Sequence, residues 1–444
     1  MLLRRSSVAR LREPGTFFWA TGIEDTFITE PWPKTGRTLD EYELTQHYER
    51  WHADLGLMAE LGVSAARYGL PWHRINPRPG VWDWEWSDRA LQRLLDLKIE
   101  PIVDLVHYGL PGWIEGAYLH PDFPRYMAEY ATRVAERYRG RIHAYTPLNE
   151  PRITAWYCGR IGWWPPFRRG WRGFVAVMAG VCRGIVETVR ALEGVDPEIL
   201  PVHVDATDLY ESPDPALASE VQQRQEMVFL ALDLISGRVG SSHPLTPWLR
   251  RHGMPDEALA WFQERAIPLP LIGINLYPMF SRKILQRTSA GRLRLRMPYA
   301  DGTIVERLAR MYSERYDAPV FVSETASVGS VPRRMAWLQD SISSTVSARR
   351  AGVPLVGYTW WPLFALVTWA YRQGTREPAY YLKQMGLWDL DEAFERQPTP
   401  LVAAYQLCCR STPEAAMGEF LSGTPESAPI TGDSSEPTTI DPVR

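Results

Sequence analysis

Two glutamates, Glu150 and Glu324, are candidate catalytic groups because each follows a run of residues typical of a buried strand. The first run ends in Y-T-P-L-N-E-P (145–151), and the second ends in F-V-S-E-T (321–325). Hydrolysis of a glycosidic bond needs one carboxylic acid to protonate the leaving oxygen and one carboxylate to attack the anomeric carbon. A separation of roughly 5–5.5 Å gives retention through a covalent intermediate, whereas a wider gap admits a water and gives inversion.

Other polar residues stand at the ends of neighbouring runs. Arg67 follows a pair of alanines, His107 ends the run L-V-H, and Asn149 precedes Glu150. A carboxylate beside Arg67 is expected to stay ionised, while a carboxyl packed against proline and aromatic residues is pushed toward its protonated form. A single glutamate after a strand is more often a surface residue or a helix cap, so the flanking residues decide the interpretation.

Short β-rich runs alternate with amphipathic helical patterns along most of the chain. This alternation predicts a parallel sheet, and eight repeats favour a closed (β/α)8 TIM barrel, of the α/β class, as a single domain. No glycine-rich phosphate loop follows the first run, which weakens the alternative of an open, doubly wound sheet. Catalytic groups of such barrels lie at the carboxyl ends of the strands. The expected strands are 17–23, 65–70, 101–107, 142–149, 199–205, 271–277, 320–324 and 354–361.

Two segments are expected to lie outside the barrel. Residues 1–14 are rich in arginine and form an N-terminal extension, and residues 15–410 form the barrel. Residues 411–444 are rich in Pro, Ser, Thr and acidic residues, a composition that buries too little apolar surface to offset chain entropy. We therefore predict a disordered tail for 411–444.

Composition excludes several other classes of function. The chain has 49 Lys and Arg against 52 Asp and Glu, so no basic surface for nucleic acid or an anionic membrane is expected. Four cysteines form neither a disulfide framework nor a zinc signature, and no apolar run is long enough to span a membrane. With no secretory signal pattern, a cytoplasmic protein is expected. We expect no metal and no cofactor, because the two-carboxylate mechanism needs neither; the sequence gives no oligomeric state.

The sequence resembles glycoside hydrolase family 1, the β-glucosidase-like family, as a divergent member. L-N-E-P at 148–151 matches the acid/base motif of that family, and V-S-E-T at 322–325 stands where its nucleophile motif is found. Four more segments match in the same order along about residues 16–409. They are A-R-Y-G-L-P-W-H-R-I (66–75), V-H-Y-G-L-P (106–111), G-I-N-L-Y (273–277) and G-Y-T-W-W-P-L (357–363), the last followed by Trp369.

The resemblance implies a role for each matching position. Glu150 would be the general acid/base and Glu324 the nucleophile of a retaining β-glycosidase. Arg67 and Tyr277 would hold Glu324, Asn149 would bind the 2-hydroxyl of the sugar, and His107 another hydroxyl. The implied partner is a small-molecule glycoside or oligosaccharide, and the positions that would face its glycone are Trp361 and Trp369.

The departures from the family pattern concentrate at the end that reads the sugar. The family has a glutamine near the first strand, where this chain has Glu24-Asp25, and we take Asp25 as the substrate-binding residue there. The family glutamate before the final tryptophan is replaced by Thr368, and Ala365-Leu366 replace an aspartate-asparagine pair. A site that hydrogen-bonds a hydroxyl strongly rejects sugars lacking it, so we expect a glycone other than plain β-glucose.

Three alternatives stay open. A transglycosidase would use the same pair but pass the glycosyl group to an alcohol. A non-catalytic sugar-binding barrel would not need both carboxylates, which argues against it. An endo-glycanase of a neighbouring barrel family would extend the altered glycone end into a cleft.

Overall fold

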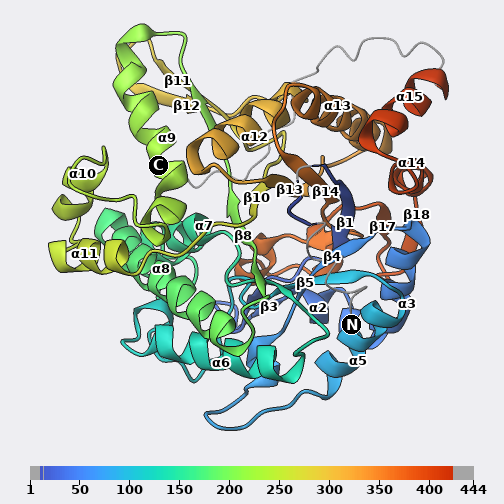
Figure 1. The fold of residues 1–444 in the computed structure, drawn as a ribbon, viewed down its shortest axis with the longest axis horizontal. Coiled ribbons are helices and arrows are strands. Elements are labelled where there is room, and N and C mark those ends of the chain that lie inside the picture. The colour runs from blue at the N-terminus through green and yellow to red at the C-terminus, as the bar shows by residue number, and fades with distance from the viewer. Residues whose placement is uncertain (1–10, 14, 424–444) are drawn as a thin grey trace.

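The computed structural model describes residues 11–13 and 15–423 of the 444-residue chain, and its centre is a barrel of parallel strands (Figure 1). Each strand is bounded by turns or loops and is almost completely buried, as expected for strands covered on both faces. The barrel strands are β1 (Phe18–Gly22), β4 (Ala65–Gly69), β5 (Glu100–Asp104), β6 (Ala144–Thr146), β7 (Leu200–Pro201), β8 (His203–Ala206), β10 (Ile272–Asn275), β13 (Val320–Thr325) and β14 (Leu355–Trp360).

The strands follow one another around the barrel in the order β7-β6-β5-β4-β1-β14-β13-β10-β8, and all neighbours are parallel. β7 and β8 are two halves of the fifth strand, separated only by Val202. The first half pairs with β6 and the second with β10, so the sheet closes on itself. The (β/α)8 barrel predicted from the sequence is confirmed, with each of its eight strands at the expected place.

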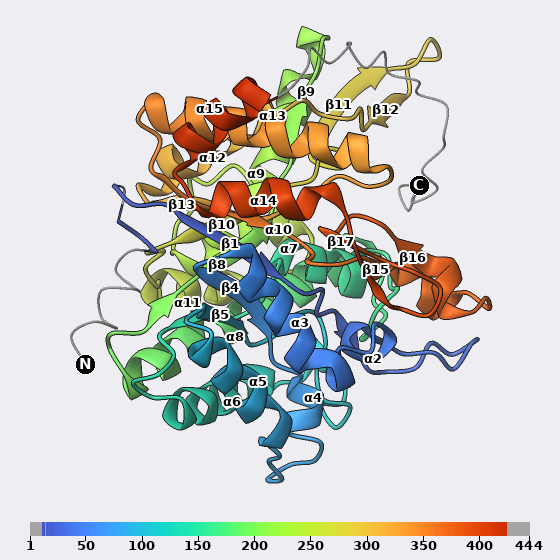
Figure 2. The ribbon, with the colours of Figure 1, turned by 90° about the vertical axis from the view of Figure 1, so that its right-hand side faces the viewer.

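Helices form the outer layer, one or more after each strand (Figure 2). In α6, for example, Met127, Tyr130 and Val134 are buried at three- and four-residue spacing, which is the apolar stripe that packs on the barrel. The main helices are α3 (His47–Leu61), α5 (Glu85–Asp96), α6 (Phe123–Arg137), α8 (Gly170–Val195), α9 (Ala218–Ile235), α12 (Thr303–Tyr316), α13 (Val331–Arg350) and α14 (Pro400–Cys409). Shorter ones are α2 (Glu41–Leu44), α4 (Trp72–Ile75), α7 (Pro151–Ala155), α10 (Thr246–Arg251) and α11 (Asp256–Glu264).

At the amino-terminal end of the strands, the barrel interior is a closed apolar core. Phe18, Ile102, Leu271 and Phe321 belong to it and are buried together. Leu11 joins the same cluster with 3% of its surface exposed, although it lies in the segment expected to be peripheral. The interior is therefore filled at this end, and polar chemistry is confined to the opposite, carboxyl-terminal end of the strands.

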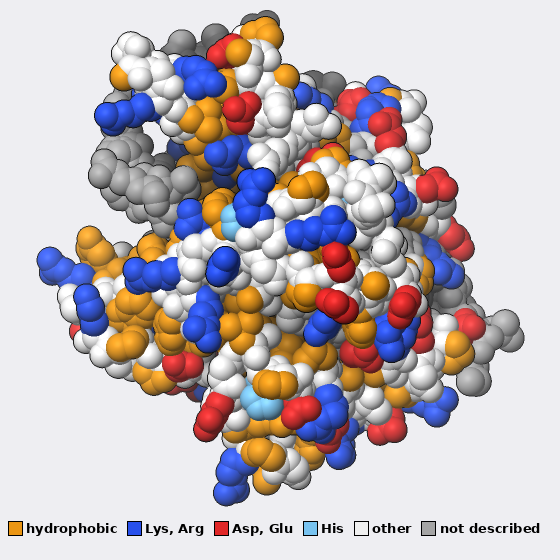
Figure 3. Space-filling model, turned by 90° about the vertical axis from the view of Figure 1, so that its left-hand side faces the viewer, with side chains coloured by type: hydrophobic (Ala, Val, Ile, Leu, Met, Phe, Trp, Pro, Cys, Tyr) orange, Lys and Arg blue, Asp and Glu red, His pale blue; other side chains and the backbone are white. Residues whose placement is uncertain are grey.

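Loops and small sheets surround that carboxyl-terminal end (Figure 2). The small strands are β2 (Phe27–Ile28) with β3 (Leu39–Asp40), β9 (Leu209–Glu211) with β11 (Arg282–Arg287) and β12 (Leu293–Arg296), β15 (Leu366–Val367) with β16 (Leu382–Lys383), and β17 (Trp388–Leu390) with β18 (Arg396–Pro398). Short 3-10 segments are η1 (Ala117–Leu119), η3 (Pro215–Leu217), η4 (Trp369–Gln373) and η5 (Pro378–Tyr381), and η2 (Trp156–Arg160) is a π turn. On the face shown in Figure 3, basic, acidic and apolar side chains are interspersed.

The disordered tail predicted for 411–444 is wrong for its first part. Residues Pro413–Gly423 form helix α15, which packs on α13. Arg349 pairs with Glu414 at 3.1 Å, and Ala416 is fully buried. The composition gave the wrong prediction for this part because proline and threonine favour a loop but also favour the start of a helix, proline at the first helical position and threonine as the cap. Residues 424–444 lie outside the described residues.

Within the described part of the chain, none of the helices combines the length and apolar character that crossing a membrane requires.

Candidate active site

Glu324 lies near the end of β13 and is held by two donors from other strands. Arg67 Nη1 donates to its Oε1 at 2.6 Å, and the hydroxyl of Tyr277 donates to its Oε2 at 2.8 Å. Glu324 is 4% exposed, so its carboxylate is nearly enclosed. Arg67 in turn donates to Asp104 at 2.5 Å, and this second contact fixes the plane of the guanidinium.

Glu150 lies four residues after the end of β6 and immediately before α7, and its backbone has a positive φ that residues other than glycine rarely adopt. Its φ is 47°, and its N–H donates to the carbonyl of Val204 at 3.1 Å. Such strain persists only where surrounding structure enforces it, and here it turns the carboxyl into the barrel mouth. Asn275 Nδ2 donates to Oε1 at 2.8 Å, and the hydroxyl of Tyr108 donates to Oε2.

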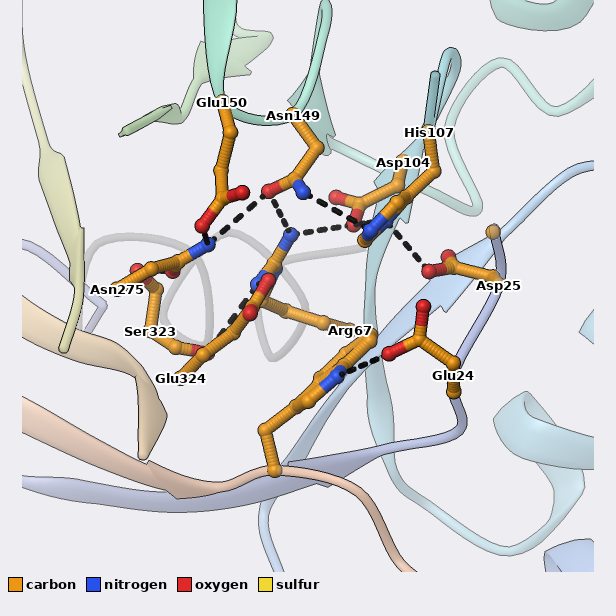
Figure 4. A network of polar contacts seen from close by, with 12 residues as sticks. Glu24, Asp25, Arg67, Asp104, His107, Asn149, Glu150, Asn275, Ser323 and Glu324 are labelled. Atoms are coloured by element: carbon orange, nitrogen blue, oxygen red, sulfur yellow. Dashed lines mark hydrogen bonds and ion pairs between the residues drawn. The ribbon is translucent and has the colours of Figure 1, made fainter. Parts of the chain in front are cut away.

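One hydrogen-bond network joins the two carboxylates (Figure 4). Asn149 Oδ1 accepts from Arg67 Nη2 at 2.9 Å, and from Asn275 Nδ2 at 3.3 Å. Arg67 bonds Glu324, and Asn275 bonds Glu150. Because both also donate to Asn149, the two acids are connected through Arg67, Asn149 and Asn275. Glu150 and Glu324 therefore belong to a single site and not to separate pockets.

Burial raises the pKa of Glu150, and burial together with the charge of Glu150 raises the pKa of Glu324. Arg67 lowers the pKa of Glu324 but does not outweigh burial. Two neighbouring buried carboxyls do not both ionise easily. The full charge of Arg67 favours the negative charge on Glu324, which leaves the proton on Glu150.

Known proteins with similar sequence or structure point to the same chemistry. The model of the family described as Glycosyl hydrolase family 1 matches residues 20–199. A bifunctional β-D-glucosidase/β-D-fucosidase from Bifidobacterium breve is 35% identical over 131 residues, and the match covers 27% of each chain. The match thus spans about a quarter of that relative. Thermostable β-glucosidase B from Thermobispora bispora is 25% identical over 433 residues, covering 83% of this chain and 86% of the relative.

The fold agrees with these matches over most of the chain. A β-glucosidase from Thermotoga maritima in complex with glucoimidazole superposes with a TM-score of 0.77 at 21% identity, covering 89% of this chain and 98% of that one. Residues 20–199 thus resemble glycosyl hydrolase family 1 in sequence, and most of the chain has the same barrel fold as this β-glucosidase. The family motifs quoted from the sequence thus lie on the strands that the barrel requires.

His107, a predicted sugar contact, already has hydrogen-bond partners within the protein. Its Nδ1 lies 2.5 Å from Asp25 Oδ1, and its Nε2 lies 2.9 Å from Asn149 Nδ2. Because Asn149 Oδ1 accepts from two donors, the amide nitrogen must face His107, and Nε2 must accept. Burial lowers the pKa of His107, but the charge of Asp25 and hydrogen bonds with Asp104 and Asp25 together raise it well above its usual value. A proton on Nε2 would nevertheless face the donor Asn149.

Asp25 and Trp361 lie beside His107. Asp25 is fully buried and packs closely on Gly69, since a Cβ added to that glycine would lie 2.0 Å from a carboxylate oxygen of Asp25. Through its contact with Nδ1, Asp25 holds His107 in place. Trp361 is also fully buried; its ring stacks on His107 with centroids 5.8 Å apart, and its Nε1 donates to Glu24 at 3.1 Å. The predicted sugar contacts of His107 and Trp361 are thus occupied by protein partners in the absence of ligand.

Trp369, the other predicted glycone residue, begins η4 and forms an aromatic wall near Glu150. Its ring meets those of Tyr108, Tyr157 and Trp164 at centroid distances of 5.5, 5.2 and 4.9 Å. Trp369 is half-buried, whereas Trp164 is 2% exposed. Half-exposed aromatic rings at a site suit the apolar C–H faces of sugars.

Four residues of the site were not singled out from the sequence. Tyr108 and Asn275 bond Glu150, Asp104 bonds Arg67, and Glu24 bonds Trp361. Tyr108 and Asn275 lie within segments that match the family pattern, so their place near a strand end could have identified them as site residues. Asp104 lies behind Arg67 and bonds its guanidinium.

Two clusters among the described residues have the geometry of metal ligands. Asp25, Asp104 and His107 form one cluster, and Glu226, Asp233 and His243 form the other. Arg67 donates to Asp104 in the first, and Arg315 donates to both acids of the second. Because an arginine already neutralises each cluster, both are explained as ion-pair networks.

Proposed function

We propose that the protein is a retaining β-glycosidase in which residues 15–410 form the catalytic barrel. Glu324 attacks the anomeric carbon while Glu150 protonates the departing oxygen, which gives a covalent glycosyl–enzyme intermediate. Glu150 then removes a proton from water, the water attacks the same carbon, and Glu324 leaves. The observation that carries this proposal is the single network in which Arg67 binds one acid and Asn275 binds the other.

The remaining site residues have positioning and binding roles in this proposal. Arg67 and Tyr277 hold the charge of Glu324, and Asn149 receives the 2-hydroxyl once substrate displaces one of its present partners. Trp369 stacks on the sugar at the mouth. Asp25, His107 and Trp361 shape the glycone end, which differs from the family pattern, and we propose that the preferred sugar is not plain β-glucose.

The Thermotoga maritima and Bifidobacterium breve proteins are named as glucosidases, and their names support a glycoside substrate here. The four cysteines are all free, which fits a reducing compartment, and we keep a cytoplasmic location as part of the proposal. Fractionation of cells expressing the natural gene would test that location.

Hydrolysis of a panel of 4-nitrophenyl α- and β-glycosides tests the function. We expect activity on β-glycosides, with the first product released in the β configuration when followed by NMR. Release of the α anomer would exclude the retaining mechanism. Background-level rates that are equal for the wild type and Glu324→Ala across the panel would favour a non-catalytic barrel, and product transfer to added alcohols in preference to water would identify a transglycosidase.

A further inference from the structure

Glu24, at the end of β1, places a carboxylate in the same site as Glu324. Its Oε1 accepts from the hydroxyl of Thr26 at 2.5 Å, and its Oε2 accepts from Trp361 Nε1 at 3.1 Å. The charge of Glu24 contributes to the raised pKa of Glu324 and of Tyr277, so these groups lie within electrostatic reach of one another. Both partners of Glu24 are neutral.

Glu41 brings a second carboxylate to this end of the site from a different segment. The pairing of β2 with β3 places it there, because its N–H donates to the carbonyl of Thr26 at 3.1 Å. Its Oε2 accepts from the backbone N–H of Val367 at 3.1 Å. Its Oε1 is buried and has no hydrogen-bond partner among the described residues.

The surroundings of Glu41 are those of a buried charge without a counter-ion. Glu41 is fully buried; burial and then the charge of Glu24 raise the pKa of its carboxyl well above the ordinary value. Val367 precedes Thr368, the position at which the family pattern has a glutamate. A carboxylate has thus been lost from the loop after β14 and another has been supplied by α2.

Three other acids of the site have an arginine or histidine partner, whereas Glu150 is bonded by the neutral Asn275 and Tyr108. Asp25 pairs with His107, and Arg67 serves both Asp104 and Glu324. Glu24 and Glu41 contact neutral donors only. Buried carboxylates without cations are costly, and two that repel one another are more so, which means that a bound positive group would relieve both.

We propose that Glu24 and Glu41 recognise a glycone carrying a protonated amine. This inference rests on the proposed glycosidase function and names its substrate class. Since Asn149 is assigned to the 2-position, the amine is placed at carbon 3, 4 or 6 of the sugar. Sugars with a phosphate or a carboxylate at this end are disfavoured, because they would add a third negative charge.

A metal ion fits the position between Glu24 and Glu41 less well than an ammonium group does. The clusters of described residues with metal-ligand geometry include Asp25, but neither Glu24 nor Glu41. No third His, Cys, Asp or Glu among the described residues therefore completes a metal-ligand cluster with either carboxylate. An ammonium group on a sugar ring can bond each of them through a separate hydrogen, since it has three donors.

The test compares 4-nitrophenyl β-D-glucopyranoside with its 3-amino, 4-amino and 6-amino deoxy analogues and its 6-phosphate. At about pH 6 the amines are protonated. We expect at least one amino analogue to exceed the parent in kcat/KM by roughly tenfold to a hundredfold, the range of a charge-assisted hydrogen bond in a buried site. Glu24→Gln and Glu41→Gln should each bring that ratio close to one; the ratio within each variant, and not the rate on the neutral parent, is the readout.

Glu43→Gln is the matched control, because Glu43 lies on the same short helix but is exposed and paired with Arg74. It should leave the ratio unchanged. If the parent glucoside is hydrolysed and no amino analogue is better, or if the phosphate is best, the inference is overturned while the glycosidase function stands.

Binding of the corresponding amino thioglycosides, measured by calorimetry, separates the two proposals. Tighter binding of an amino thioglycoside to the wild type than to Glu24→Gln would support this recognition. If no oxygen glycoside of the panel is hydrolysed as well, the recognition stands and the glycosidase function is contradicted. Equal binding of amino and neutral sugars would overturn the recognition.

Discussion

The two halves of the site differ in how their charges are balanced. Around Glu150 and Glu324, Arg67 and the two asparagines give every acid a protein partner before any ligand binds. Around Glu24 and Glu41, by contrast, no cation donates to either acid, and Oε1 of Glu41 has no hydrogen-bond partner among the described residues. The first region is preorganised for reaction, which is where fixed dipoles contribute most to catalysis. In the second region, a ligand would have to supply the missing positive charge. Related proteins can differ in substrate at such a place.

The largest effect is expected at the catalytic half. Glu324→Gln removes the nucleophile but keeps a group of the same shape for Arg67 and Tyr277 to contact. We expect kcat/KM on the best aryl β-glycoside to fall by roughly 10⁴-fold or more. Steady-state kinetics, with a thermal melt to confirm folding, measures this. Retention of a tenth of wild-type activity would remove Glu324 from the mechanism.

Glu150→Gln should show a loss that depends on the leaving group. An activated 2,4-dinitrophenol departs without a proton, whereas an alkyl alcohol needs one from Glu150. We expect a loss of about 10²–10⁴-fold for alkyl glycosides and a much smaller one for the first step with the dinitrophenyl glycoside. Glu129→Gln, on the exposed face of α6, is the control. An equal loss on both substrates would contradict an acid role.

Tyr108→Phe tests whether the hydroxyl on Glu150 tunes the acid. The Tyr108 hydrogen bond lowers the pKa of Glu150, so its removal should raise that pKa and move the alkaline limb of the kcat/KM profile to higher pH. We expect kcat/KM to fall by about tenfold at the optimum. Tyr130→Phe, a buried tyrosine that stacks on Trp72, should leave the profile in place. An unmoved limb in Tyr108→Phe would show that the hydroxyl only fills space.

The smallest effect is expected on stability at the other half. A carboxyl whose pKa is raised in the folded state weakens the fold as the pH rises above its unfolded value, here 4.5 for Glu41. Glu41→Gln should therefore stabilise the unliganded protein by about 1 kcal/mol near neutral pH, with a gain that shrinks toward pH 4.5. Melting curves across pH measure this against Glu43→Gln. A gain that does not vary with pH would contradict a charged, unpaired Glu41.

Much of the barrel was predictable because its strands are short buried runs bounded by turns, and because polar residues collect at their ends. The boundaries of the helices were less predictable. The pattern over 43–61 reads as one helix, but Gln46 adopts a φ of 60° and divides it into α2 and α3. Ser87-Asp88 reads as a helix start, yet α5 begins at Glu85, and Asp88 bonds Arg137 and Tyr138 from α6 and its end. Tertiary contacts decided both.

The site was predictable where strand position alone fixes it. Glu150, Glu324, Arg67 and Asn149 follow directly from strand ends, and the structure brings them into one network. Glu41 could not be found this way. It comes from a short helix that follows a small hairpin, and only the pairing of β2 with β3 brings it to the barrel mouth.

Covalent trapping tests the central claim most directly, because it asks which carboxylate attacks the sugar. A 2-deoxy-2-fluoro-β-glycoside with a good leaving group should inactivate the enzyme and leave one glycosyl ester, which peptide mass spectrometry should locate on Glu324. Glu150→Gln should still be labelled, and Glu324→Gln should not. An ester on any other residue, or efficient hydrolysis with no trapped ester for any fluorosugar of a reactive glycone, would contradict the account.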